Sequence, residues 1–289
     1  MDKCFYTPAD VSGRAIMEKT VLGEYPSVHK CKIAKSILGV PINAYIIGEG
    51  SRYVAFFGAH HASESITCNL LFTFIYEFMR GVSKGREKEC QLFRDFRYVI
   101  VPAVNPDGIE IAMHGAGESV IRERILRMLS LSESVWQANA RGVDLNHNYP
   151  YRFYEYKALE KERGITAGAT RYSGEYPESE PETKAVLGLV RTLSPIGILS
   201  LHSQGEEIFH IGGDRLSRIA ERLSGICGYT PSSPSSLASY GGLCDYTSSI
   251  GIPSFTIEVG RGENPLPLSM LDRLKNRLYM AFLSFPTML

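Results

Sequence analysis

Four side chains in this sequence are of the types that metal-dependent hydrolysis requires: His61, Glu64, His202 and Glu258. His61 and Glu64 are three residues apart, close enough for an imidazole and a carboxylate to bind one cation. With His202 as a third ligand, a fourth position remains for water, which is typical of catalytic rather than structural zinc. Glu258 would then take the proton of that water as a general base. These residues predict a hydrolase with one zinc ion per chain.

Short apolar runs, typical of buried strands, precede these residues. The runs cover residues 53–57, 98–104, 196–201 and 253–257. Each run is followed by polar residues: the first by His61 and Glu64, the second by Asn105, the third by His202 and the fourth by Glu258. Open α/β sheets bind their ligands outside the carboxyl ends of their strands. We therefore expect these polar residues to meet at one edge of a sheet.

The remaining periodicity predicts helices between the strands. Helical patterns cover residues 11–25, 66–80, 120–131, 181–193, 214–227, 246–250 and 271–282, and two further strand-like runs cover residues 28–34 and 40–47. We expect those two runs to form a meander leading into the strand at 53–57, and Asn105 to Gly108 to form a turn. Residues 115–176 are expected to be largely irregular binding surface. Alternating helices and strands predict one α/β domain over residues 1–289, with a mostly parallel or mixed sheet and residues 1–50 as an integral part.

Composition and charge exclude several classes of function. The 289 residues are 44% hydrophobic and 21% charged, as in a globular protein with a sizeable core. Lys plus Arg and Asp plus Glu both number 31, so no basic excess points to nucleic acid. No apolar run approaches the ~18 residues of a membrane span, and the N-terminus lacks the apolar core of a signal peptide. We therefore expect a cytoplasmic protein without nucleic-acid or membrane partners, and its oligomeric state stays open.

The six cysteines, at positions 4, 31, 68, 90, 227 and 244, show neither a CxxC pair nor an even framework. Such a scatter is typical of buried thiols in a reduced compartment, which agrees with the expected location. A disulfide between two of them is the alternative.

Other interpretations of the ligand residues stay open at this point. An HxxE string is common by chance and also occurs at an ordinary solvated helix start. Two histidines with one carboxylate also suit a non-haem iron oxygenase. His60 competes with His61 as a ligand, although only His61 has the short spacing to Glu64. The additional Glu258 favours zinc, because a lone acid at the end of a core strand is rare unless it is paired or functional.

Six motifs add to these residues: HASE at 61–64, NPDG at 105–108, RGVDLNHNY at 141–149, SEPET at 179–183, LHSQGEE at 201–207 and TIEVG at 256–260. Each is weak alone, but in this order they resemble the zinc carboxypeptidases of the carboxypeptidase A superfamily, across roughly residues 54–268. The resemblance implies a single α/β/α domain with a mixed, twisted sheet of about eight strands. It also implies zinc bound by His61, Glu64 and His202, with Glu258 as general base and then general acid.

Three longer runs narrow the resemblance: WxAN followed by RGVDLN from Trp136, HSQGEEI after the third ligand, and GRGENPLPLS from Gly260. They are most similar to the bacterial γ-D-glutamyl-meso-diaminopimelate peptidases, which cut peptidoglycan stem peptides. This implies a peptidase that hydrolyses an amide bond in a small peptide or muropeptide. Those enzymes often carry cell-wall-binding repeats. Because the sequence contains none, we expect an intracellular form that acts on recycled muropeptides or during sporulation.

The sequence departs from the family where substrate groups are bound. The family usually has Asn-Arg to bind a substrate carboxylate, but this chain has Asn146 and His147, and an imidazole lacks the bidentate fork of arginine. Gln137 replaces the arginine that polarises the carbonyl in digestive relatives. Arg141 is the nearest cation in sequence and is our candidate for oxyanion stabilisation.

Further positions concern specificity. The tyrosine that caps substrate in relatives aligns with Leu237, and Tyr240 could replace it. Cys244 would line the specificity pocket in the same alignment. The neighbouring carboxylates that could meet the amino group of diaminopimelate, or simply hydrogen-bond local backbone, are Asp245, Glu206 and Glu207.

Several functions fit these residues. The first is a zinc metallopeptidase that acts on stem peptides of the γ-D-glutamyl-diaminopimelate type. The second is a weakly active or non-catalytic peptide-binding protein on the same fold, suggested by the loss of both family arginines. A metallocarboxypeptidase or zinc acylase of other specificity is a third. Glu258 favours an enzyme, because a pure binding protein has little use for this carboxylate.

Overall fold

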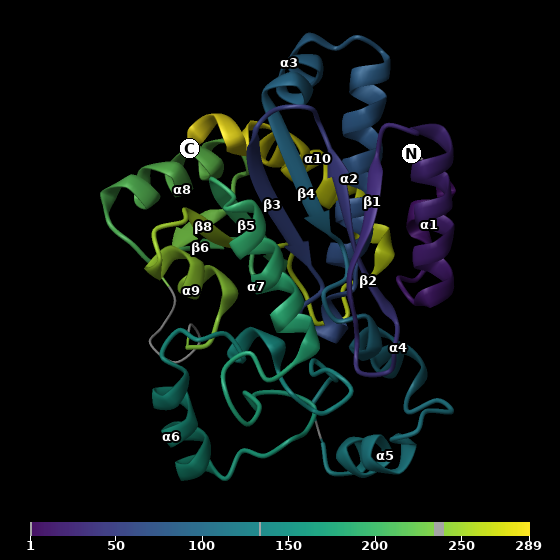
Figure 1. Cartoon of the computed structure of the whole chain (residues 1–289), viewed down its shortest axis with the longest axis vertical. Helices are drawn as coiled ribbons and strands as arrows, with labels where there is room; N and C mark the ends of the chain where they lie inside the picture. Colours follow the sequence, from purple (N-terminus) through teal and green to yellow (C-terminus); the bar gives the residue numbers. More distant parts are fainter. Residues whose placement is uncertain (1, 133, 234–239) are drawn as a thin grey trace.

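The computed structural model of the chain describes residues 2–132, 134–233 and 240–289. One mixed sheet of eight strands lies between two layers of helices. Shorter helices and long loops cover the lower end of the sheet in Figure 1. In the described part of the chain, no helix is long and apolar enough to cross a membrane. The arrangement confirms the predicted α/β/α class and the expected number of strands.

The sheet has the strand order β1-β2-β4-β3-β5-β8-β6-β7. The strands are β1 His29–Lys35, β2 Pro41–Ile47, β3 Arg52–Gly58, β4 Phe96–Val101, β5 Gly197–His202, β6 Glu207–Phe209, β7 Thr230–Ser232 and β8 Ser254–Glu258. The central strands β4, β3, β5 and β8 are parallel, whereas β1 with β2, β2 with β4, and β6 with β8 are antiparallel. The carboxyl ends of β3, β5 and β8 therefore meet at one edge, which is where the candidate residues were expected.

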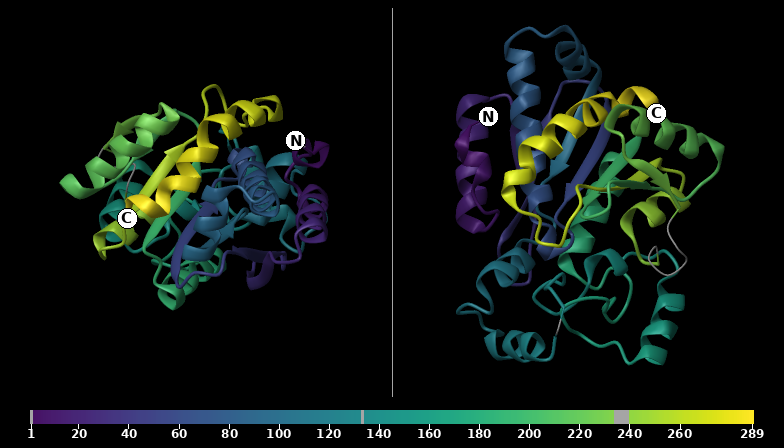
Figure 2. Two further views of the ribbon diagram at one scale, coloured as in Figure 1. Left: turned by 90° about the horizontal axis from the view of Figure 1, so that it is seen from above. Right: turned by 180° about the vertical axis from the view of Figure 1, so that it is seen from behind.

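Helices cover both faces of the sheet. They are α1 Val11–Glu24, α2 Ile66–Ser83, α3 Glu87–Asp95, α4 Pro106–His114, α5 Arg122–Ser130, α6 Phe153–Arg163, α7 Pro181–Leu193, α8 Asp214–Cys227, α9 Leu243–Ser249 and α10 Leu271–Ser284. Short 3-10 turns are η1 Lys3–Tyr6, η2 Ala62–Glu64, η3 Leu145–His147, η4 Leu268–Met270 and η5 Phe285–Met288. Helices α1, α2, α8 and α10 pack on one face, and α7 and α9 pack on the other (Figures 1 and 2).

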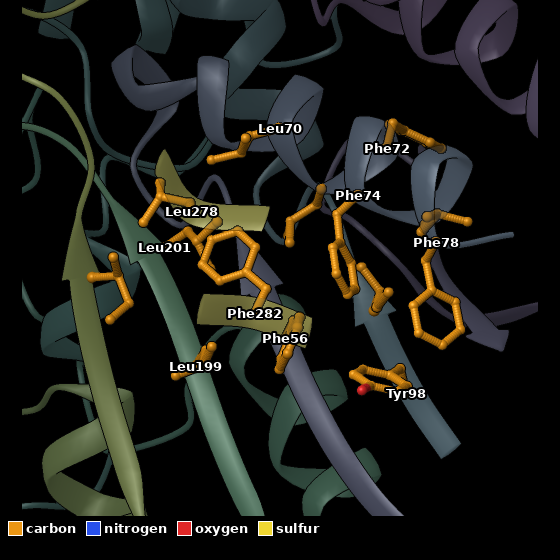
Figure 3. Close-up of a cluster of buried hydrophobic side chains, with 14 of the residues drawn as sticks. Phe56, Leu70, Phe72, Phe74, Phe78, Tyr98, Leu199, Leu201, Leu278 and Phe282 are labelled. Carbon is orange, nitrogen blue, oxygen red and sulfur yellow. The ribbon is translucent and has the colours of Figure 1, made fainter. Parts of the chain in front are cut away.

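An aromatic cluster joins β3 to the helices behind it (Figure 3). The ring of Phe56 on β3 lies 5.6 Å from that of Phe74 on α2 and 5.8 Å from that of Phe282 on α10. Tyr98 on β4 contacts the same ring, with centroids 5.8 Å apart. Such aromatic pairs stabilise a core beyond the area that they bury. The cluster fixes β3 against α2, and therefore also the loop that connects them.

The prediction of a meander was wrong in one respect. β1 and β2 form the expected antiparallel pair, but β2 continues to β4 and not to β3. β3 and β4 are parallel, and the chain between them passes through α2 and α3 before returning to the sheet. That crossover places β4 between β2 and β3, which local periodicity cannot reveal.

The predicted turn at residues 105–108 is instead the start of α4. Oδ1 of Asn105 accepts a hydrogen bond from the backbone amide of Gly108 (2.9 Å), so Asn105 caps the helix. Pro106 occupies the first turn, where its missing N–H costs nothing. The residue types that favour a turn also favour a helix start, and in this protein the segment begins a helix.

Sequence periodicity also missed or misjudged several elements. β6 and β7 have three residues each, too few to show alternation, and α3 and α6 are largely polar. α2 is buried on nearly all sides, because α1, α3 and α10 pack against it as well as the sheet.

The cysteines agree only partly with the prediction of buried thiols. All six are free, which excludes a disulfide among them. Cys68, Cys227 and Cys244 are buried, whereas Cys31 is exposed on the edge strand β1.

Candidate metal centre

The first two candidate ligands lie in the loop between β3 and α2. After Gly58, Ala59 adopts a left-handed backbone conformation, with φ at 49°. The hydroxyl of Thr67 accepts a hydrogen bond from the Ala59 amide and donates one to the Glu64 carbonyl, both at 2.8 Å. The 3-10 turn η2 follows His61, and in such a turn side chains three residues apart lie one above the other. The loop therefore directs His61 and Glu64 to the same side.

Strand register brings the third ligand and the candidate base together. His202 ends β5 and is directly opposite Glu258, the last residue of β8. Leu201 is opposite Gly58 of β3, so His202 extends one residue beyond the last paired residue of that strand. Opposed residues of neighbouring strands project from the same face of a sheet. His202 and Glu258 therefore share one face at the carboxyl edge.

The donor atoms of the three candidate ligands converge on one point. Nδ1 of His61 is 2.9 Å from Oε1 of Glu64 and 3.3 Å from Nδ1 of His202. Two ligands bound at ~2.0–2.1 Å to one tetrahedral zinc would be ~3.3–3.4 Å apart. Oε2 of Glu64 is buried and, although 3.1 Å from Nδ1 of His202, accepts no well-formed hydrogen bond from the described residues. The three residues could therefore hold a metal ion.

Asp144 is a fourth member of this group, and it was not assigned a role from the sequence. Its Oδ1 lies 3.1 Å from Nε2 of His61, and its side chain is 3% exposed. A metal-binding histidine usually donates its second ring N–H to a carboxylate, which fixes its tautomer and orientation. Asp144 thus leaves Nδ1 of His61 as the ligand atom. The one sequence signal for Asp144 is its position in the RGVDLN motif, two residues before Asn146.

Buried charges in the centre compensate one another. Burial would lower the pKa of His61, but the negative charges of Glu64 and Asp144 hold it well above its usual value. Burial would likewise raise the pKa of Glu64, but the adjacent His61 and His202 lower it to about 2. Burial opposes ionisation of Asp144 too, and the charge of His61 keeps its pKa far below the ordinary range. Two ionised carboxylates therefore flank His61, an arrangement that attracts a cation.

The candidate base behaves in the opposite way. Burial, and then the charge of Glu64, raises the pKa of Glu258 well above its usual value. Glu207 adds to this effect, because it lies opposite Glu258 in the β6–β8 pair. The pKa of Glu64 is lowered and that of the neighbouring Glu258 is raised. Two carboxyl groups with pKa values shifted in opposite directions are typical of an acid–base site.

The ring of His60, the alternative ligand, stacks on that of His202, with centroids 5.5 Å apart, but its nitrogens face other partners. It is fully buried, with Nε2 at 3.0 Å from the Tyr149 hydroxyl and Nδ1 at 3.4 Å from the Ser200 hydroxyl. Burial lowers the pKa of His60 well below its usual value. The ring is therefore neutral and structural, and the preference for His61 from its spacing to Glu64 agrees with the geometry.

Asn146 and His147 lie beside the centre but are held by local contacts. Oδ1 of Asn146 accepts a hydrogen bond from the Leu243 amide at the start of α9 (3.2 Å). Nδ1 of His147 is 2.6 Å from the Tyr240 carbonyl, and its ring stacks on Tyr156 with centroids 4.1 Å apart. A carbonyl only accepts, so Nδ1 of His147 carries the proton. In the neutral ring, Nε2 is then an acceptor, which does not attract a carboxylate.

Gln137 and Arg141 were expected near the scissile carbonyl. The carbonyl of Gln137 accepts from the Ala62 amide (3.0 Å), so this residue lies against the ligand loop, and its Oε1 accepts from the Thr170 hydroxyl (2.5 Å). The guanidinium of Arg141 is 3.6 Å from Glu180 and lines a separate polar cavity of about 270 Å³. The assignment of Arg141 to the oxyanion stays a prediction, and its described side-chain contact is with Glu180.

The remaining specificity candidates are mostly packed. Tyr240 is 8% exposed, and the guanidinium of Arg152 covers its ring at 4.1 Å. Cys244 is buried in α9, and burial raises the pKa of its thiol to about 12, so the thiol is uncharged. Leu237 lies outside the described residues.

Of the three candidate carboxylates, Glu206 is already engaged. Its oxygens contact Arg261, Arg273 and Arg277 at 2.6–3.4 Å. Within the part of the chain that the structure describes, Oε1 of Glu207 has one hydrogen-bond partner, the Ser232 hydroxyl at 3.2 Å. Burial raises the pKa of Asp245 to about 7. Glu207 and Asp245 therefore remain as candidates, whereas Glu206 is structural.

Asn139 contacts two buried carboxyl groups, those of Glu180 and Glu182. Nδ2 of Asn139 donates to Glu180 (2.8 Å) and is 3.4 Å from Oε2 of Glu182. Glu182 is fully buried and its Oε1 has no hydrogen-bond partner among the described residues. Burial, and the nearby charge of Glu180, raises the pKa of Glu182 to about 8. Its protonated form fits this environment better than the ionised form.

The fold is α/β/α, a His-Glu-His triad lies at the ends of its strands, and beside the triad is a carboxyl group with a raised pKa. Together these features define a metallohydrolase with a single metal ion. Comparison with known proteins agrees: a family model described as zinc carboxypeptidase matches residues 16–279. The chain therefore belongs to the zinc carboxypeptidase family, whose members are metallopeptidases that use one zinc ion.

Relatives support the same assignment. The γ-D-glutamyl-L-diamino acid endopeptidase 1 of Lysinibacillus sphaericus is 31% identical over 278 residues, which is 90% of this chain and 67% of the relative. The structure of bovine thrombin-activatable fibrinolysis inhibitor superposes with a TM-score of 0.78 at 21% identity, covering 98% of this chain and 97% of that one. The structure of the murein-tripeptide amidase of Escherichia coli O157 superposes with a TM-score of 0.56 at 18% identity, covering 88% of this chain and 90% of that one. The two structural matches concern the fold alone.

The contact between Asp144 and His61 leads to a first prediction. Asp144→Asn keeps the shape of the side chain but removes the charge that orients His61, so zinc affinity should fall by about 10–100-fold. Competition with a chelator of known affinity measures this. The matched control is Asp95→Asn, which changes an exposed aspartate on α3. Equal zinc affinity in both variants would contradict the role of Asp144.

Glu182 leads to a second prediction, on stability. Its pKa is raised from 4.5 to about 8, so within this window the folded chain holds a proton that the unfolded chain has lost. The free energy of unfolding therefore falls as pH rises through the window, by up to ~1.4 kcal/mol per pH unit from this group. Glu182→Gln removes the effect. The melting temperature of this variant, relative to that of the wild type, should therefore rise between pH 5 and pH 8. The exposed Glu175→Gln serves as control; a pH-independent difference for Glu182→Gln would refute the account.

Proposed function

We propose that this chain hydrolyses the amide between a γ-D-glutamyl residue and a diamino acid in peptides of the peptidoglycan stem type. One observation carries the hydrolytic part: the donor atoms of His61, Glu64 and His202 converge, with Glu258 opposite His202. The substrate part is supported by the relative that shares 31% identity over 90% of this chain, a γ-D-glutamyl-L-diamino acid endopeptidase.

Each residue has a distinct task in the proposed reaction. His61, Glu64 and His202 would hold zinc, which would lower the pKa of a water molecule and polarise the scissile carbonyl. Glu258 accepts a proton from the attacking water and delivers it to the amide nitrogen that leaves. Its raised pKa suits both steps, because the carboxylate takes the proton readily and can hold it until the bond breaks. Asp144 keeps His61 in the tautomer that binds the metal.

The contacts of His147 support a substrate without a required C-terminal carboxylate at this position. Its Nδ1–H is committed to the Tyr240 carbonyl, so the neutral ring offers only an acceptor. An exopeptidase that selects a terminal carboxylate needs a fixed cation there. The replacement therefore favours cleavage within a peptide over removal of a terminal residue.

Glu207 is the carboxylate best suited to recognise a second amino group. Register places it opposite Glu258, and Gly205 lies close to both side chains, so that a larger residue there would crowd them. The neighbouring Glu206 is neutralised by arginines, whereas Glu207 contacts only a hydroxyl among the described side chains. A carboxyl group at this position favours a substrate with an ammonium group.

Replacing the general base leads to a third prediction. Glu258→Gln keeps the volume and the strand pairing but cannot take a proton, so kcat should fall by about 10²–10⁴-fold while one zinc per chain is retained. Hydrolysis of γ-D-glutamyl-diaminopimelate peptides is followed by mass spectrometry, and metal content by elemental analysis. Glu263→Gln, an exposed change five residues later, should behave as wild type. Full hydrolysis by zinc-loaded Glu258→Gln would remove Glu258 from the mechanism.

Substrate recognition leads to a fourth prediction. For Glu207→Gln, kcat/KM for γ-D-glutamyl-diaminopimelate should fall about tenfold, which corresponds to ~1.4 kcal/mol, because a charged hydrogen bond is lost. The same variant should cleave γ-D-glutamyl-L-alanine as well as the wild type does. Asp245→Asn in the same assays tests the second candidate. Equal losses on both substrates would assign Glu207 to catalysis, and cleavage of N-acyl amino acids in preference to either peptide would indicate an acylase.

A further inference from the structure

The loops that follow the third metal ligand and the general base lie side by side. Residues 203–206 connect β5 to β6 and belong to the HSQGEEI motif; we call them the ligand-side loop. Residues 259–267 follow β8 and contain most of the GRGENPLPLS motif; we call them the base-side loop. The first loop begins directly after His202 and the second directly after Glu258. Contacts between the two loops therefore influence where the base lies relative to the ligand.

The backbone pairing at this end of the sheet is short. The Val259 amide donates to the His202 carbonyl at 2.8 Å, and a second backbone hydrogen bond of the same length joins the two loops. β6 and β8 share three residue pairs, and one of them places Glu207 opposite Glu258. Like charges directly opposite one another destabilise a strand pair. The pairing around the base therefore benefits from further support.

The side chain of Asn264 in the base-side loop supplies this support. Its Oδ1 accepts a hydrogen bond from the Ser203 hydroxyl, and its Nδ2 donates to the Ser203 carbonyl, both at 2.7 Å. Asn264 thus binds one residue with both ends of its amide, and that residue is the neighbour of His202 in the chain. Ser203 is only 4% exposed, so water competes little for these hydrogen bonds.

The base-side loop is itself anchored in the core. Gly260 adopts a left-handed conformation, with φ at 68°, and a Cβ at this position would lie 2.9 Å from Cδ1 of Leu266. Leu266 is buried and belongs to the core cluster beneath α10. The turn at Gly260 and the anchor at Leu266 therefore set the direction of Asn264 between them.

An ion pair between the loops is a weaker link. Nε of Arg261 is 3.4 Å from Oε2 of Glu206, but the Arg261 side chain is 73% exposed. Exposed ion pairs contribute little to stability, because water and salt screen them. The pair of Asn264 with Ser203 is therefore the stronger side-chain link between the loops.

We propose that Asn264 is a positioning residue for the general base: by binding Ser203, it fixes the Glu258 carboxylate relative to His202. This inference rests on the role in hydrolysis proposed above for Glu258. Proton transfer requires a short and well-aligned contact, and a misplacement of ~1 Å can cost ~10²-fold in rate. Asn264 should therefore affect the rate of the chemical step and leave substrate binding unchanged.

Three variants of the full-length, zinc-loaded protein test the proposal: Asn264→Ala, Ser203→Ala and the double variant. The matched control is Asn276→Ala, which makes the same change at an exposed position on α10. The values of kcat and KM are measured on a γ-D-glutamyl-diaminopimelate peptide. Zinc affinity is measured by competition with a chelator, and the melting temperature is recorded for each variant.

Crystal structures provide a readout that does not depend on activity. The zinc-loaded wild type and Asn264→Ala, in the same crystal form, are compared for the position of the Glu258 carboxylate relative to His202. If Asn264→Ala does not fold, Ser203→Ala replaces it, because that variant loses only one of the two hydrogen bonds.

For Asn264→Ala, kcat should fall about 10–100-fold while KM stays within about twofold of the wild type. Zinc affinity should be unchanged, because β5 and the ligand loop hold the triad. The double variant should be no slower than the slower single variant, since both residues form one contact. The Glu258 carboxylate should move by more than ~0.5 Å. Asn276→Ala should match the wild type in every measurement.

Three results would overturn the proposal. Unchanged kcat with a lowered melting temperature would leave Asn264 with a role in stability alone. A raised KM with unchanged kcat would indicate that Asn264 contacts the substrate. A Glu258 carboxylate that keeps its position in the variant crystal would exclude positioning, whichever substrate the enzyme cleaves. Failure of the wild type to cleave the peptide would instead refute the proposed substrate, and the crystal structures would still decide the role of Asn264.

Discussion

The buried carboxylate of Glu64 imposes the constraint on which the rest of this structure depends. An ionised carboxylate removed from water costs several kcal/mol unless opposite charge and hydrogen bonds surround it. Here His61 and His202 supply those contacts, and their charges lower the pKa of Glu64 to about 2. Asp144 in turn supports His61 from the far side of its ring. The same group of charges, with one oxygen of Glu64 left without a well-formed hydrogen bond, is a site prepared for a cation.

The fold can be understood as the scaffold that keeps this arrangement rigid. Parallel pairing aligns the ends of β3, β5 and β8, which fixes where the loop and His202 begin. The aromatic cluster around Phe56 fastens β3 to α2 and α10, so the connecting loop has both ends anchored. On the other side, Asn105 donates to the carbonyls of His60 and Ala138 and joins the ligand loop to the segment that carries Asp144. A site built between several anchored elements holds its geometry better than one on a free loop.

The sequence sufficed for the parts of the site that depend on local pattern. Apolar runs followed by His61, His202 and Glu258 predicted three strand ends at one edge, because strand burial leaves a periodic record in the sequence. The position of β4 between β2 and β3 could not be predicted, since register and strand order arise from packing between distant segments. Asp144 was missed for a related reason: its role depends on a contact across 83 residues. Glu206 and Glu207 are adjacent in sequence, and only the arginines of α10 and the preceding segment distinguish the satisfied carboxylate from the available one.

The most direct test of the account is X-ray absorption spectroscopy of the zinc-loaded protein, since the central claim concerns which atoms surround the metal. We expect one zinc per chain, bound only by nitrogen and oxygen at ~2.0–2.1 Å, with the multiple-scattering pattern of two imidazoles. A sulfur shell at ~2.3 Å would instead place the metal on a cysteine such as Cys244. That result, or scattering without two imidazoles, would contradict a centre formed by His61, Glu64 and His202.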